Sequence, residues 1–130
     1  MNTTTIDKAK LAKGIPEYHQ LLASDADWIA RCADDVRQLR NTPPFSKVSD
    51  KDFEAFVSGL VFGRGGIVGA TYKPLMNELT ISEIYDVFAH FGISVDLATR
   101  SLEYKATGSG CSFDFWSICL NETKEPFPTK

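Results

Sequence analysis

The chain has 130 residues, of which 43% are hydrophobic and 24% are charged. This length suits one domain with a single core, and the composition is far from that of disordered chains. Its net charge of −3 at pH 7 argues against nucleic acid as a partner, because binding to a phosphate backbone needs clustered lysine and arginine.

The sequence also lacks the usual signals for membranes and export. Every apolar run is too short to cross a bilayer, and residues 1–5 do not show the basic-then-apolar pattern of a signal peptide. We therefore expect a cytoplasmic protein without membrane contacts.

The three cysteines do not form a recognisable disulfide framework, because their number is odd and no CxxC pair is present. Cys111 and Cys119 fall on one predicted strand. Eight residues of extended strand would separate them by about 26 Å, well beyond disulfide reach unless the strand folds back. The sequence predicts three free thiols.

We expect one globular domain over residues 15–121, between a flexible arm at residues 1–14 and a loose tail at residues 122–130. Apolar residues then recur at helical spacing from Pro16 to Arg40. This pattern leaves open whether the segment is one helix or two helices that meet near Ala23.

Two further helices have clear boundaries. The first begins after the cap Ser49 and is predicted to end at Gly63. The second begins at a capping box formed by Thr80 and Glu83, and Gly92 is placed to end it.

The remaining segments predict strands. Residues 67–72 are short and β-branched, and residues 102–107 alternate between apolar and polar side chains. A glycine-rich turn leads into a returning strand at residues 111–120. The sum is an α+β fold, in which three to four helices pack on a small antiparallel sheet of about three strands ending in a C-terminal hairpin.

Possible ligand-binding groups are scattered through the chain. The loop at residues 63–66 contains Arg64 and three glycines, which together suit an anion. Phosphate loops run from strand to helix, whereas this loop is predicted to run from helix to strand. A turn that ends a helix is therefore the favoured interpretation.

A catalytic thiol is the second chemical hypothesis. Cys111 follows a glycine turn, and His90 or His19 would serve as its base. The competing interpretation places Cys111 in a buried strand face and makes His90 a partly exposed structural residue. Tyr72 would join Arg64 in such a pocket. The spacing of histidines, cysteines and carboxylates predicts no metal site, and no motif calls for a cofactor.

Two surfaces suit a protein partner. Asp27, Asp34 and Asp35 are spaced to give an acidic helical face, with local pairing to Arg31. Asp114 and Trp116 belong to an aromatic strand segment that is either an exposed anchor or part of the core.

The residues therefore favour a non-catalytic protein-binding module, namely an accessory, inhibitor or immunity-type protein that acts on one larger protein partner. The alternative is a small enzyme or ligand-binding domain with a pocket between helices and sheet that uses Arg64, Cys111 and His90. A homo-oligomer that hides the aromatic face is a third hypothesis.

Overall fold

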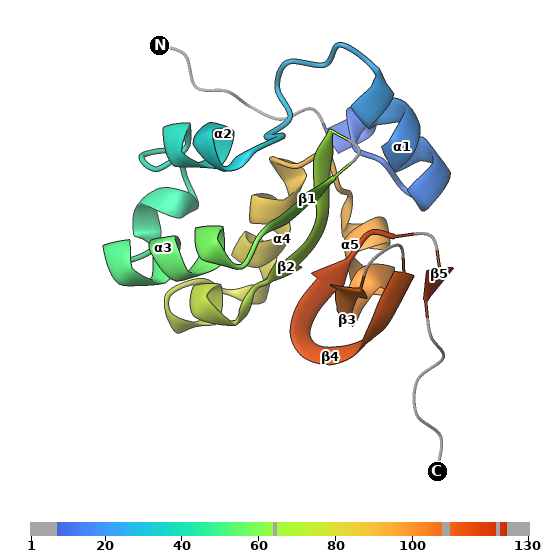
Figure 1. Ribbon diagram of the computed structural model, residues 1–130. Helices are drawn as coiled ribbons and strands as arrows, with labels where there is room; N and C mark the ends of the chain where they lie inside the picture. Colours follow the sequence, from blue (N-terminus) through green and yellow to red (C-terminus); the bar gives the residue numbers. More distant parts are fainter. Residues whose placement is uncertain (1–7, 64, 108–109, 122, 125–130) are drawn as a thin grey trace.

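The computed structural model of the chain describes residues 8–63, 65–107, 110–121 and 123–124 (Figure 1). Over these residues it is one small α+β domain, so the predicted class is confirmed. The helices are α1 (Ile15–Ala23), α2 (Ala33–Gln38), α3 (Asp50–Ser58), α4 (Ile81–Ala89) and α5 (Val95–Ser101), with short 3-10 helices at Lys8–Lys10, Phe45–Lys47 and Lys73–Asn77. The strands are β1 (Val61–Gly63), β2 (Gly66–Thr71), β3 (Leu102–Thr107), β4 (Gly110–Cys119) and β5 (Thr123–Lys124).

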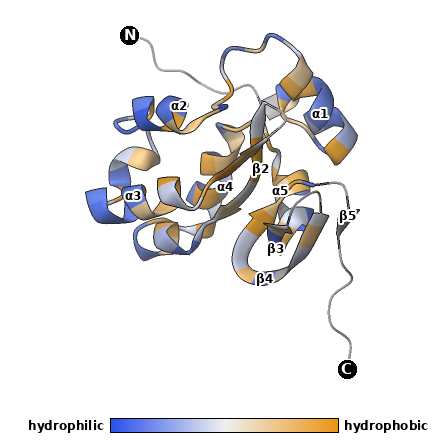
Figure 2. Cartoon of the chain, viewed as in Figure 1, coloured by the Kyte–Doolittle hydropathy of each residue, from blue (hydrophilic) through white to orange (hydrophobic). Residues whose placement is uncertain are grey.

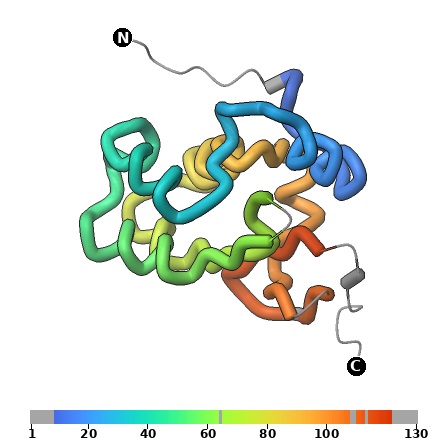
Figure 3. Tube along the Cα trace, turned by 45° about the horizontal axis from the view of Figure 1, so that its top comes forward, coloured from blue at the N-terminus to red at the C-terminus, as the bar shows by residue number. Residues whose placement is uncertain are grey.

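The sheet has more strands than the three expected from the sequence. Its order is β1-β2-β4-β3 with antiparallel pairing throughout, and β5 pairs with β4 in parallel. The helix α1 and the strand β4 lie at one end of the molecule, and α2 and α3 lie at the other (Figures 1 and 3). No helix in the described ranges is long and apolar enough to cross a membrane.

The core is built around α4, whose ribbon is mostly hydrophobic in Figure 2. Its predicted capping box is confirmed, because the Glu83 N–H donates to Thr80 Oγ1 at 3.2 Å and the Thr80 N–H donates to Glu83 Oε1 at 2.9 Å. Gly92 follows the helix with φ +90°, a backbone conformation that suits glycine. The largest fully buried side chains are Tyr18, Phe45, Phe56, Phe88, Phe91, Ile67, Leu75, Ile93, Leu97, Ile118, Leu120 and Val36.

The segment from Pro16 to Arg40 forms two helices, α1 and α2, with an irregular connection between them. Arg31 organises this connection. Its guanidinium donates at 2.7–3.2 Å to the carbonyl oxygens of Leu22, Ser24, Ala26 and Gly65. The predicted helical face shared by Arg31 with acidic residues is therefore absent, because Arg31 holds backbone carbonyls instead.

The glycine loop at residues 63–66 joins two strands, which corrects the predicted order of helix, loop and strand. α3 ends at Ser58 with Gly59 as its C-cap, so the predicted helix end at Gly63 is wrong. The residues that follow, beginning with Val61, pair with β2. Arg64 lies outside the described residues.

Part of the predicted N-terminal arm belongs to the domain. Leu11 and Ala12 are buried, and Ala12 forms a parallel bridge with Ile93. The Arg100 guanidinium also donates to the carbonyl of Lys13. Residues 1–7 and most of the predicted tail lie outside the described residues.

Candidate functional site

The strand β4 reverses direction within its own length, and we call its residues 110–119 the hook. Its first arm pairs with β3, where Ala106 faces Cys111, and its second arm pairs with β2, where Gly69 faces Cys119. The Cα atoms of Cys111 and Cys119 consequently lie 5.9 Å apart. The straight strand predicted from the sequence is therefore wrong.

The reversal requires an unusual backbone at Trp116, whose φ is 68°. Glu103, on the neighbouring strand β3, has φ 67°. Left-handed conformations at residues other than glycine cost of order 1–3 kcal/mol and concentrate at functional sites. The surrounding contacts must compensate for that cost.

A disulfide between Cys111 and Cys119 joins the two arms of the hook. The prediction of three free thiols is therefore wrong for these two residues, because the folded-back strand brings its ends together. Both cysteines are buried, and they pack with Tyr104 and Ala106 in a second, smaller core. Cys32 is a free and exposed thiol.

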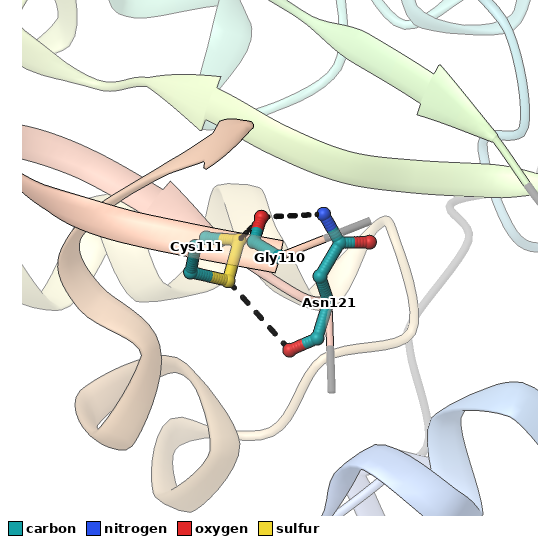
Figure 4. Close-up of a disulfide and its surroundings, with 4 residues drawn as sticks. Gly110, Cys111 and Asn121 are labelled. Atoms are coloured by element: carbon teal, nitrogen blue, oxygen red, sulfur yellow. Dashed lines mark hydrogen bonds between the residues drawn. A yellow bond between two sulfur atoms is a disulfide. The ribbon is translucent and has the colours of Figure 1, made fainter. Parts of the chain in front are cut away.

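Hydrogen bonds reinforce the hook where the disulfide joins its two arms (Figure 4). The Asn121 side-chain amide donates to the Gly110 carbonyl at 2.8 Å, and Cys111 Sγ lies 3.6 Å from the Asn121 carbonyl oxygen. The neighbouring strand β3 also packs closely over β2, since a Cβ added at Gly69 would lie 2.9 Å from the Cβ of Ala106. The disulfide and the contacts of Asn121 thus hold the two arms of the hook together.

The other end of the hook, residues 114–116, is its tip and carries two exposed aromatic rings. Phe115 is 61% exposed and Trp116 is 40% exposed. Their ring centroids lie 6.3 Å apart, and the Trp116 ring also meets the buried Tyr72 edge to face at 6.4 Å. The tip therefore presents two exposed aromatic rings, and the buried Tyr72 forms its base.

Glu103 fastens the tip to this base. One carboxylate oxygen accepts a hydrogen bond from the Trp116 N–H at 2.7 Å, and the other accepts from the Tyr72 hydroxyl at 2.5 Å. Burial, the hydrogen bond to Glu103 and the charge of Glu103 all raise the pKa of Tyr72. The Tyr72 N–H completes the link by donating to the Trp116 carbonyl at 2.8 Å.

A second carboxylate lies within the tip itself. Asp114 accepts a hydrogen bond from the Ser117 hydroxyl at 3.0 Å. Ser117 is buried, so this bond ties the start of the tip to the second arm. Glu103 therefore contacts the backbone of Trp116, and Asp114 contacts the side chain of Ser117, within the segment that carries the exposed rings.

Similarity to known proteins adds nothing to this geometry. Comparisons with protein-family models, curated proteins and solved structures found no match. The site must be interpreted from its own residues.

The sequence-predicted ligand groups do not form one site among the described residues. Cys111 lies in the smaller core, whereas His90 contacts Phe45 of the main core, with ring centroids 5.5 Å apart. Tyr72 belongs to the base of the hook. No group of three or more histidine, cysteine and acidic side chains in the described ranges is suited to hold a metal ion.

The predicted acidic face is divided by the structure. Asp27 and Asp34 are exposed, but Asp27 lies on the irregular connection and Asp34 lies on α2. Asp35 accepts a hydrogen bond from the Arg31 N–H at 2.9 Å, which gives it a structural role. Of the three predicted residues, Asp27 and Asp34 are thus the exposed acidic groups that a partner could reach.

His90 is more buried than the sequence indicated, with 6% of its surface exposed. Burial lowers its pKa, while a hydrogen bond with the Pro43 backbone and the charge of Asp86 oppose that shift. In an unfolded chain the pKa of histidine is about 6.5. Below that pH the imidazole of residue 90 binds a proton in the unfolded chain more readily than in the native state. The native state therefore loses stability as the pH falls.

We therefore expect the free energy of unfolding to decrease from pH 7.5 to pH 5.5 more in the wild-type protein than in a His90→Gln variant. Urea denaturation at the two pH values measures both differences. Since His19 is present in both proteins, their contrast isolates His90. Parallel decreases in the two proteins would show that His90 does not contribute.

Proposed function

We propose that the chain is a non-catalytic protein-binding module, an accessory, inhibitor or immunity-type protein that docks on one larger protein through the tip of the hook. The observation that carries this proposal is the exposed pair Phe115 and Trp116, held on the buried Tyr72 by the hydrogen bonds of Glu103. Aromatic side chains dominate binding energy at protein interfaces, and a pre-ordered anchor loses little conformational entropy on binding.

The unfavourable backbone conformations in and beside the hook support the same proposal. A left-handed tryptophan and a left-handed glutamate are unfavourable for folding, yet the disulfide and the Glu103 bonds maintain them. A strained backbone that displays aromatic rings is better explained by recognition than by stability.

The alternative function, an enzyme or ligand-binding domain that uses Arg64, Cys111 and His90, has weaker support. Nucleophilic catalysis by cysteine needs a thiolate, and Cys111 is engaged in the disulfide. His90 is also packed in another part of the domain.

The cytoplasmic location stays a prediction, and the disulfide weighs against it. Disulfides persist mainly in oxidising compartments, whereas cytosolic thiols are kept reduced. An oxidising environment is therefore the setting in which the hook would keep the closed form described above.

A pull-down with the tagged chain and matched variants tests whether the tip of the hook is the docking surface. Phe115→Ser with Trp116→Asn removes both rings, and asparagine tolerates the left-handed backbone at position 116. Ile81→Ser with Val95→Ser is the control, because these residues are 57% and 51% exposed at other places on the surface. We expect the wild type and the control to retain one partner at a fixed ratio, and the hook variant to bind it at least about tenfold more weakly.

The same experiment includes Asp27→Lys with Asp34→Lys. Loss of the partner from this variant alone would transfer the interface to the acidic residues. Equal retention by all variants would contradict the hook as the docking site. Association of the tagged chain only with itself would indicate a homo-oligomer instead.

A further inference from the structure

The tip of the hook combines exposed aromatic rings with negative charge. Glu103 and Asp114 contact the backbone of Trp116 and the side chain of Ser117, respectively. Among the described residues, neither carboxylate forms an ion pair with a lysine or arginine. The ion pairs found there are Arg37–Glu54, Arg40–Asp50 and Lys47–Glu83.

The two carboxylates differ in what they can offer a ligand. Both oxygens of Glu103 already accept hydrogen bonds, from Trp116 and Tyr72, so Glu103 contributes mainly its charge. Asp114 accepts one bond, on a single oxygen, from Ser117. Its second oxygen has no donor among the described residues and remains available to a partner.

Aromatic faces attract cations because the face of the ring is electron-rich. Arginine fits such a surface better than lysine does, since its planar guanidinium stacks on a ring and donates to a carboxylate at the same time. The tip offers both elements, because Trp116 and Phe115 present rings and Asp114 presents an acceptor.

We infer that the tip of the hook binds an arginine side chain of the partner protein. The guanidinium stacks on the exposed aromatic pair and donates to Asp114, and the charge of Glu103 strengthens the attraction. This inference rests on the proposed function and adds the chemistry of the partner: a basic segment with at least one accessible arginine.

A peptide titration tests this chemistry without the partner. The chain has two tryptophans, so Trp28→Phe leaves Trp116 as the only tryptophan reporter. Acetylated triarginine amide is then added while Trp116 fluorescence is recorded. The same titration is made with trilysine and triglutamate, and with the additional changes Asp114→Asn or Asp34→Asn. Asp34 is an exposed carboxylate on α2, at the opposite end of the molecule.

We expect a saturable fluorescence change with triarginine, a weaker one with trilysine and none with triglutamate. Asp114→Asn should weaken triarginine binding at least about threefold, and Asp34→Asn should leave it unchanged. The inference is overturned if triarginine gives no saturable change, or if Asp114→Asn and Asp34→Asn behave alike.

Failure of this inference is distinguishable from failure of the proposed function. A partner that requires Phe115 and Trp116 but binds Asp114→Asn normally would keep the hook as the docking site and exclude arginine recognition. A partner that binds every hook variant normally would contradict the proposed function, whatever the peptide titration gives.

Discussion

Removal of the disulfide by Cys111→Ala with Cys119→Ala is expected to lower the free energy of unfolding by about 2–3 kcal/mol. The disulfide closes a short loop in the unfolded chain, and chain-entropy arguments give this magnitude for a loop of that size. Both cysteines are also buried in the smaller core, so their replacement by alanine would remove packing contacts there. We expect the hook to lose more of its structure than the rest of the domain, because Trp116 needs the closed strand to keep its left-handed backbone.

Urea denaturation of the oxidised protein and of the variant measures this difference. Cys32→Ser is the matched control, since Cys32 is exposed and free, and we expect it to change stability by less than about 0.5 kcal/mol. Adding a dithiol reductant should move the wild type towards the double variant and leave the variant itself unaffected. A double variant as stable as the oxidised wild type would show that the hook stays closed without the bond.

The elements that sequence analysis predicted correctly are those specified by neighbouring residues. The capping box of Thr80 and Glu83 fixes the start of α4, and glycine at position 92 fixes its end. Alternation of polar and apolar residues likewise identified β3. Each signal operates within a few residues, so it is visible without the tertiary structure.

The helix α5 and the early end of α3 were missed for related reasons. Ser94 caps α5 by accepting from the Leu97 N–H, but the helix has only seven residues and gives a weak periodic signal. At α3, apolar residues continue at helical spacing beyond Gly59 into β1. Pairing of β1 with β2 decides the outcome, and that pairing is not encoded locally.

The hook could not be predicted because its causes are distant in sequence. The reversal occurs at a tryptophan, without the glycine or proline that usually marks a turn. Glu103, which holds the tip, was not among the candidate residues, because its partners Trp116 and Tyr72 lie 13 and 31 positions away. The even-numbered side chains of β4 also do not share one environment, since Trp116 is exposed and Ile118 is buried.

The largest single contribution of a side chain to the hook is expected from Glu103. We expect Glu103→Ala to lower the free energy of unfolding by about 2–3 kcal/mol, because a charged acceptor with two hydrogen bonds is lost. Alanine keeps the Cβ, so the cost of the left-handed backbone at this position is unchanged. Lys105→Ala, an exposed residue on the same strand, should cost less than about 0.5 kcal/mol.

A double-mutant cycle with Tyr72→Phe separates the hydrogen bond from general damage to the strand. In the wild type, Tyr72→Phe removes the hydroxyl that donates to Glu103 and should cost about 1–2 kcal/mol. In the Glu103→Ala background the hydroxyl is already unpaired against the buried base, so the same change should cost almost nothing or stabilise the protein. Additive losses would mean that Glu103 acts on the hook only through the Trp116 N–H, and Tyr72 would then serve the tip solely as the ring beneath it.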